Sequence, residues 1–161
     1  MGYYDTAQVC RRGHVITGYF NKYPQFRQNF CDKCGEATVT QCEACGAAIR
    51  GGYHHDGLVL GASYDTPPDY CHACGKQYPW TASKMQAAKE LVDELDSLDN
   101  EDRRILKQSL DDLVTESPKT EVASLRFKRI MKKVGKESYE AVKTVVTDLV
   151  SESIKKTLFK P

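Results

Sequence analysis

The stretch CDKCGEATVTQCEACG, residues 31–46, contains two Cys-x-x-Cys-Gly knuckles separated by seven residues. A two-residue spacer lets both thiolates of a knuckle reach the same metal ion. The glycine that follows can adopt the left-handed conformation that turns backbone N–H groups toward the sulfurs. A third knuckle, CHACG at 71–75, and the opening CRRGH at 10–14 extend the pattern. Four pairs of candidate ligands supply enough donors for two tetrahedral zinc ions with none left over.

The pairing of these ligands decides the architecture. The candidate ligands are Cys10, His14, Cys31, Cys34, Cys42, Cys45, Cys71 and Cys74. Sequential pairing gives the first four to one ion and the last four to the other, and residues 35–41 then form a strand between two zinc ribbons. We favour this arrangement. A cross-braced arrangement, which joins the first pair to the third and the second to the fourth, is the alternative that the spacing does not exclude.

Both predicted ions are structural. A catalytic zinc keeps one coordination position open for water, whereas here every position has a protein ligand. Six of the seven cysteines lie in Cys-x-x-Cys pairs, which in a reducing compartment indicates metal binding rather than disulfides. No run approaches the ~20 apolar residues of a membrane span, and the opening residues lack signal-peptide order. We therefore expect a cytoplasmic location and no membrane contact.

Composition divides the 161 residues near Trp80. Residues 1–80 hold all the cysteines and histidines, and residues 81–161 read as amphipathic helix. We expect a helix over 84–97 that starts at a capping box formed by Ser83 and Gln86, and a second from about residue 100. A third is expected between the N-cap Ser117 and Gly135, and a fourth after it. The predicted fold is a small metal-bound β domain, a double zinc ribbon over 1–80, plus an all-α bundle of about four helices over 81–161.

Several segments could bind partners. The aromatic residues in GYFNKYPQFRQNF (18–30) could stack on bases, but packing around the metal sites is the favoured interpretation. His72 is expected to point outward from its knuckle. His54 and His55 could form an accessory site with Asp56, although a polar loop is the favoured interpretation.

The third helix is the most basic part of the chain. Seven basic residues and one acid lie between residues 119 and 136, whereas the two preceding helices are acidic. Pairing of these helices, within the bundle or between subunits, is favoured over phosphate binding. The apolar end of the chain, with Ile154, Leu158 and Phe159, favours an oligomer.

The opening MGYYDTAQVCRRGHVIT, the three knuckles and the stretch TPPDYCHACGKQYPWT together resemble a bacterial protein family of unknown function that begins with a tandem zinc ribbon. The resemblance covers the first 80 residues and all eight ligand positions. It implies a rubredoxin-like double ribbon in a bacterial cytoplasm and no particular activity. Similar Cys-x-x-Gly-His openings lead ribbons attached to signalling and anti-phage effector proteins, and the expected setting is therefore bacterial signalling or defence.

The sequence leads to a ranked set of functions. The first is a non-enzymatic interaction or scaffold module that binds two Zn²⁺ per chain. In this module the ribbons recognise a partner and the helices assemble with a second copy or with another protein. The alternative is a nucleic-acid-binding protein that uses the basic helix 119–136 with Arg11 and Arg12. A metal-dependent enzyme would need an open coordination position, and we expect no enzymatic activity.

Overall fold

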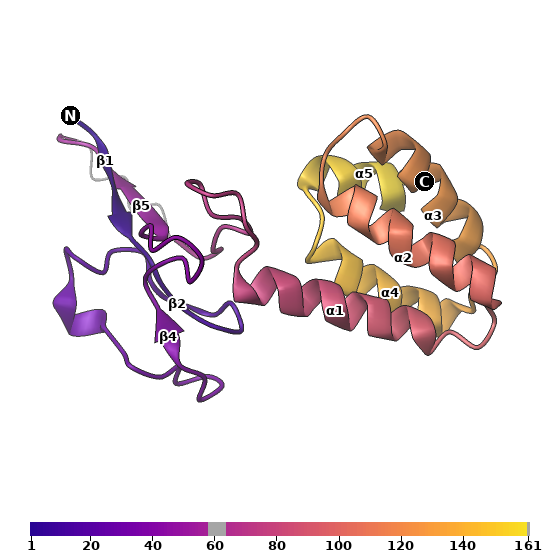
Figure 1. The fold of residues 1–161 in the computed structure, drawn as a ribbon, viewed down its shortest axis with the longest axis horizontal. Helices are drawn as coiled ribbons and strands as arrows, with labels where there is room; N and C mark the ends of the chain where they lie inside the picture. The colour runs from indigo at the N-terminus through magenta and orange to yellow at the C-terminus, as the bar shows by residue number, and fades with distance from the viewer. Residues whose placement is uncertain (58–63, 161) are drawn as a thin grey trace. The chain divides into compact units, whose positions relative to one another are not determined.

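The computed structural model describes residues 1–57 and 64–160, which divide into two compact units, Met1–Ser83 and Lys84–Pro161. The first unit contains short strands and the cysteines, and the second is helical (Figure 1). This is the predicted fold class of a small metal-binding β region followed by helices. No helix in the described part of the chain is both long enough and apolar enough to span a bilayer.

The described residues of the first unit form two small antiparallel sheets. Strand β1 (Tyr3–Thr6) pairs with β5 (Arg50–His54) in one of them. In the other, β2 (Gln8–Cys10) lies between β3 (Val15–Thr17) and β4 (Thr38–Val39). The predicted strand at 35–41 is thus present, and its regular part is β4. A one-turn helix η1 (Pro24–Phe26) lies in the loop between β3 and β4.

The core of the first unit is small and includes metal-ligand candidates. Its buried residues are Ala7, Val9, Cys42, Ile49, Cys71, Tyr78 and Trp80. The rings of Tyr78 and Trp80 stack with their centroids 4.7 Å apart. The indole N–H of Trp80 donates to the carbonyl of Pro68 at 2.9 Å, which fixes the ring against the preceding loop. Because this core is small among the described residues, we expect a bound metal to contribute much of the unit's stability.

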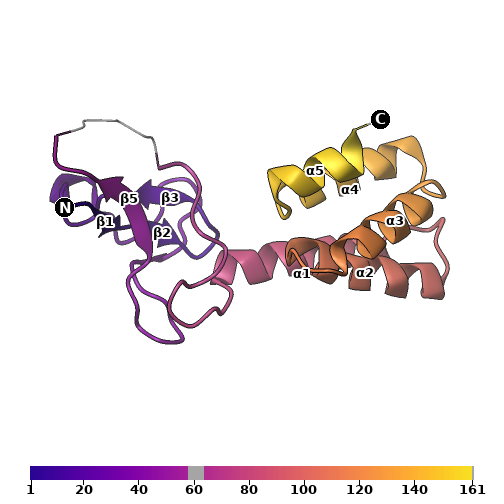
Figure 2. The ribbon, with the colours of Figure 1, turned by 90° about the horizontal axis from the view of Figure 1, so that it is seen from above.

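Five helices follow in the described part of the chain, and the second and third of them lie side by side in the second unit (Figure 2). Their bounds are α1 (Pro79–Asp93), α2 (Asn100–Val114), α3 (Thr120–Met131), α4 (Lys136–Thr147) and α5 (Glu152–Phe159). Helix α1 begins in the first unit and continues into the second. Buried apolar residues from all five helices form one core, including Val92, Leu106, Phe127, Val146 and Leu158.

Three of the predicted helices have wrong boundaries. Helix α1 begins at Pro79, so Ser83 lies inside it and no capping box forms there. Proline suits the first turn because it lacks the N–H that would be unsatisfied at that position. The predicted fourth helix is two helices, because Ser151 caps a new one by accepting a hydrogen bond from the N–H of Ile154. The third helix starts at Thr120, after a turn in which the Ser117 hydroxyl accepts from the N–H of Lys119.

Candidate metal centres

The three Cys-x-x-Cys-Gly knuckles have the same backbone geometry. In each, the N–H of the first cysteine donates to the carbonyl of the residue after the glycine. The N–H of the glycine donates back to the carbonyl of that cysteine, and all six bonds measure 2.8 to 2.9 Å. The three glycines have positive φ, from 71° to 76°, as the motif predicts. An isolated antiparallel bridge closes the base of every knuckle. The sequence motif alone therefore sets the local shape of each site.

The CRRGH turn forms a similar pair of backbone hydrogen bonds, although its spacer has three residues. The N–H of Cys10 donates to the carbonyl of His14 at 2.9 Å, and Gly13 donates back to Cys10 at 2.8 Å. The N–H of His14 also donates to the Cys10 sulfur at 3.3 Å. Because Cys10 ends β2 and Val15 begins β3, the turn between these paired strands presents both ligand side chains.

The eight ligand candidates form two groups in the described part of the chain. One comprises Cys10, His14, Cys31 and Cys34, and the other Cys42, Cys45, Cys71 and Cys74. Within each group the ligand atoms lie within 4.8 Å of one another. These are the groups of the sequential pairing and not those of the cross-braced one. Both groups are therefore positioned to hold a metal ion.

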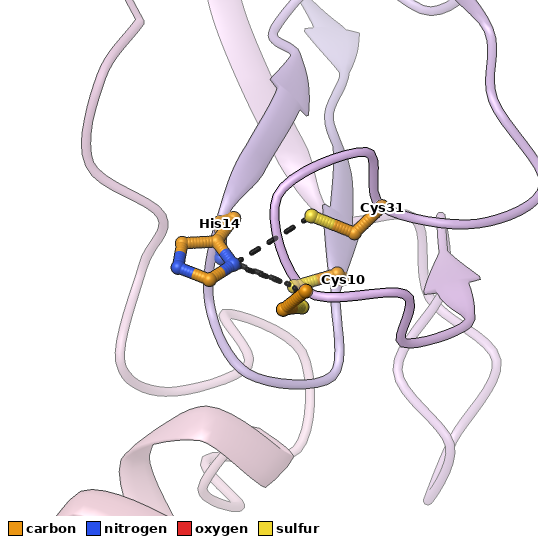
Figure 3. Close-up of side chains that lie close together, drawn as sticks. Cys10, His14 and Cys31 are labelled. Atoms are coloured by element: carbon orange, nitrogen blue, oxygen red, sulfur yellow. Dashed lines mark hydrogen bonds between the residues drawn. The ribbon is translucent and has the colours of Figure 1, made fainter.

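The distances within the groups fit a tetrahedral ion. Two thiolates about 2.3 Å from a tetrahedral ion lie about 3.8 Å apart, and a thiolate and an imidazole nitrogen lie about 3.6 Å apart. The Cys10 and Cys34 sulfurs are 3.8 Å apart, as are those of Cys42 and Cys74. Nδ1 of His14 lies 3.5 Å from the Cys10 sulfur and 3.6 Å from that of Cys31 (Figure 3). The imidazole thus presents Nδ1 as its ligand atom.

The pKa values of two cysteines in the second group are shifted in opposite directions. The N–H groups of Cys74 and Ala73 lower the pKa of Cys71 to about 6. For Cys45 the N–H of Ala47 acts in the same direction, but burial and the neighbouring sulfurs outweigh it and raise the pKa to about 12. Four adjacent thiols cannot all ionise without a cation among them. A divalent metal ion removes this conflict and deprotonates its ligands.

The two groups differ in solvent access. In the first, Cys10 and Cys31 are buried and the other two ligands are half-buried. In the second, Cys42 and Cys71 are buried, whereas Cys45 and Cys74 are exposed. The second site therefore presents two of its sulfurs to solvent.

Tyr78 and Trp80 are buried aromatic residues of the cysteine-containing core, and the apolar and cysteine patterns of the sequence did not predict this role. Burial and the nearby Cys71 thiolate raise the pKa of Tyr78, which keeps its hydroxyl protonated. The signal was available in the sequence, because both residues lie within six positions of Cys74, at the start of the first helix.

The aromatic residues of the 18–30 segment do not pack around the metal as predicted. Tyr23, Phe26 and Phe30 are 38%, 55% and 66% exposed. Tyr19 and Phe20 are half-buried. Their rings pack against other parts of the unit surface, since Tyr19 lies over Gly52 and Phe20 is covered by the guanidinium of Arg27 at 4.1 Å. The packing prediction is therefore wrong for the exposed residues, and the first unit has an exposed aromatic surface.

Three histidines lie outside both metal groups in the described part of the chain. His72 is exposed in the spacer of its knuckle. His54 Nδ1 lies 3.4 Å from the ammonium of Lys22, and His55 contacts the carbonyl of Asp56. The Asp56 carboxylate pairs instead with the amino group of Met1 at 3.0 Å. These contacts form no accessory metal site.

The basic side chains proposed for nucleic-acid binding fall into two classes. Arg11 pairs with Glu43 at 2.7 Å and Arg12 with Glu36 at 3.6 Å, which offsets their charge. In the basic segment 119–136, Lys133 pairs with Asp102 at 2.7 Å. The other six basic residues have no ion pair within the described ranges: Lys119, Arg126, Lys128, Arg129, Lys132 and Lys136. Acids of α1 and α2 pair with lysines of the same two helices instead.

Residues 3–158 match the model of a family described as an uncharacterized protein conserved in bacteria (DUF2321). No curated protein and no solved structure matches the chain. The match covers both the metal groups and the helices, so the two units occur together in this family.

Proposed function

The chain belongs to this uncharacterized family conserved in bacteria, and from its geometry we propose that it is a non-enzymatic, zinc-stabilised interaction module. The first unit recognises a partner protein, and the second assembles with another copy or another chain. The observation that carries the proposal is an exposed aromatic surface on a scaffold whose cysteines are committed to two complete four-ligand groups.

Zinc is the metal that fits the donor sets best. Sets of three thiolates with one imidazole, and of four thiolates, are typical of structural zinc. Four protein donors leave no position for a substrate or a catalytic water, which supports a structural role and a non-enzymatic function.

Native mass spectrometry of the intact protein tests this assignment. We expect two zinc ions per chain, and one after Cys45→Ser removes an exposed ligand of the second group. Ala44→Ser, a polar change at the neighbouring knuckle position, is the matched control and should keep both ions. Retention of two ions by Cys45→Ser would contradict the ligand assignment.

The recognition surface is a continuous line of side chains, which we call the aromatic row: Tyr3, His54, Lys22, Tyr23 and Phe26. The Tyr3 and His54 rings lie 5.2 Å apart, and His54 accepts a hydrogen bond from Lys22 at 3.4 Å. The Lys22 ammonium lies 5.4 Å from the centre of the Tyr23 ring, which contacts Phe26 edge-on at 6.0 Å. Tyrosine and phenylalanine are enriched in the buried centres of protein interfaces, where they supply large apolar area at low entropic cost.

The second unit offers a separate surface for assembly. Val122 and Leu125 on α3 are 47% and 64% exposed. Residues three apart are neighbours on a helix surface, so these two side chains form one apolar spot between basic residues. Burial of this spot by another chain would remove both side chains from water.

A variant pair separates the two surfaces. Tyr23→Ser with Phe26→Ser should abolish retention of the partner from a nuclease-treated bacterial extract while leaving the sedimentation coefficient unchanged. Val122→Ser with Leu125→Ser should leave partner retention unchanged and lower the sedimentation coefficient. Partner retention that is the same for the native chain and the aromatic-row variant would overturn the proposal.

Nucleic-acid binding is the second candidate, and the unpaired basic residues of segment 119–136 favour it. Binding through about six phosphates should weaken about a thousandfold between 50 and 200 mM salt. Fluorescence anisotropy with a labelled oligonucleotide measures this slope, and replacement of Arg126, Arg129 and Lys132 by glutamine should flatten it. Such a result would replace the protein-recognition proposal, whereas a flat or undetectable response would remove this candidate.

A further inference from the structure

The second unit contains a pocket of about 270 Å³ between α3, α4 and the end of α5. Its floor consists of Phe127, Met131 and Leu158, and Tyr139 of α4 forms one wall. The edge-on contact of Phe127 with Phe159, with ring centres 6.0 Å apart, holds α3 and α5 together beside it. The floor residues belong to the core of the unit, so the pocket has a fixed apolar base.

Three lysines surround the mouth of this pocket: Lys128, Lys132 and Lys160. None of them has an ion pair within the described ranges. A fourth ammonium, that of Lys143, lies 5.7 Å from the centre of the Phe159 ring, so the surroundings are also basic. Adjacent ammonium groups repel one another, and an anionic occupant relieves this repulsion.

The size of the pocket limits what can enter it. Sites for drug-sized ligands and cofactors usually measure about 300 to 1,000 Å³, so this pocket lies just below that range. It fits one apolar side chain, whose backbone would then cross the lysine rim. A peptide with carboxylates on either side of that anchor matches both the apolar floor and the positive rim.

We propose that this pocket binds an acidic peptide segment of a partner protein, which inserts one apolar side chain and pairs its carboxylates with Lys128, Lys132 and Lys160. The inference rests on the proposed function, because it names the chemistry of the partner that the helical unit takes.

The test uses the full-length, zinc-loaded chain and a fluorescein-labelled peptide that carries one phenylalanine between two runs of three glutamates. Anisotropy at fixed ionic strength measures Kd. Replacement of Lys128, Lys132 and Lys160 by glutamine should weaken binding at least about tenfold, since three exposed ion pairs together contribute on that order. Replacement of the peptide phenylalanine by serine should weaken binding by a similar factor.

The matched control replaces Lys119, Lys136 and Lys156 by glutamine. These lysines are exposed in the same unit, have no ion pair within the described ranges, and lie outside the pocket lining. The control makes the same change in net charge, so its Kd should change less than about twofold if the pocket is specific. Equal weakening by both triple variants would show diffuse attraction, and no effect of the serine peptide would show an unused floor. Either result overturns the inference.

Two further outcomes identify other occupants. Binding of an oligonucleotide that the pocket variant abolishes, with no binding of the peptide, would assign the pocket to nucleic acid. A change from oligomer to monomer in the pocket variant alone, again without peptide binding, would assign it to a second copy. Both overturn the inference. Loss of partner retention in the aromatic-row variant would still support the proposed function, so the two failures are distinguishable.

Discussion

At the scale of single residues, backbone conformation and one aromatic ring constrain the CRRGH turn. Gly13 has φ of 91°, and a Cβ built on it would lie 2.9 Å from Cβ of Trp80. Gly35 has φ of 71°, but a Cβ there would meet nothing within 4 Å. The two glycines therefore share the conformational requirement, and Gly13 alone carries an added steric one.

We expect Gly13→Ala to lower the free energy of unfolding by about 2–4 kcal/mol, from left-handed strain plus overpacking against Trp80. Gly35→Ala should lower it by about 1–2 kcal/mol, since only the strain applies. Guanidinium unfolding of the zinc-loaded protein, followed by the fluorescence of the single tryptophan, measures both values. Equal losses for the two variants would show that the Trp80 contact has no role in stability.

At the scale of elements, side-chain caps mark where α2 and α5 begin. Asp99 begins α2 by accepting a hydrogen bond from the N–H of Asp102 at 2.8 Å. Ser151 does the same for α5, and its hydroxyl also donates to Glu116 at 2.5 Å. The break between α4 and α5 lets Leu149 and Val150 turn into the core, where they are 7% and 8% exposed. The apolar spacing alone predicts one continuous helix through this point, because the spacing carries no information about a side-chain cap.

Replacement of the α5 cap tests this account. Ser151→Ala should destabilise the protein by about 0.5–2 kcal/mol, because the N–H of Ile154 loses its acceptor. Ser153→Ala, an exposed position inside α5, is the control and should be neutral or slightly stabilising. Thermal unfolding followed by far-UV circular dichroism measures the difference. Similar stability of the two variants would mean that the break depends on the core contacts of Leu149 and Val150 alone.

At the scale of the whole molecule, the two units depend on different sources of stability. Among the described residues, the core of the first contains seven buried residues, and two of them, Cys42 and Cys71, are metal-ligand candidates. The described core of the second contains eighteen buried residues and no metal-ligand candidate. We therefore expect metal binding to be coupled to folding in the first unit and not in the second.

Removal of the metal with a strong chelator should therefore unfold the first unit and leave the helices intact. Hydrogen exchange should show loss of protection in β1 to β5, with protection retained in α2 to α5. Added zinc should restore the protected state, which controls for irreversible damage. Simultaneous loss of protection in both units would contradict the independence of the helical core. We also expect the second metal to leave first, because two of its sulfurs are exposed.

The sequence by itself determined the knuckles, the candidate ligand residues and the presence of the helices. These features depend on contacts within a few residues, such as the hydrogen bond from Cys31 to Glu36 or the cap at Asp99. Only the tertiary structure decided which ligand pairs form one group, because this requires residues as distant as Cys42 and Cys74 to meet. It also decided that Phe26 is exposed and that Lys128, which has no ion pair within the described ranges, lies beside a pocket. Burial and ion pairing depend on the elements that pack against a side chain, and local sequence does not encode that packing.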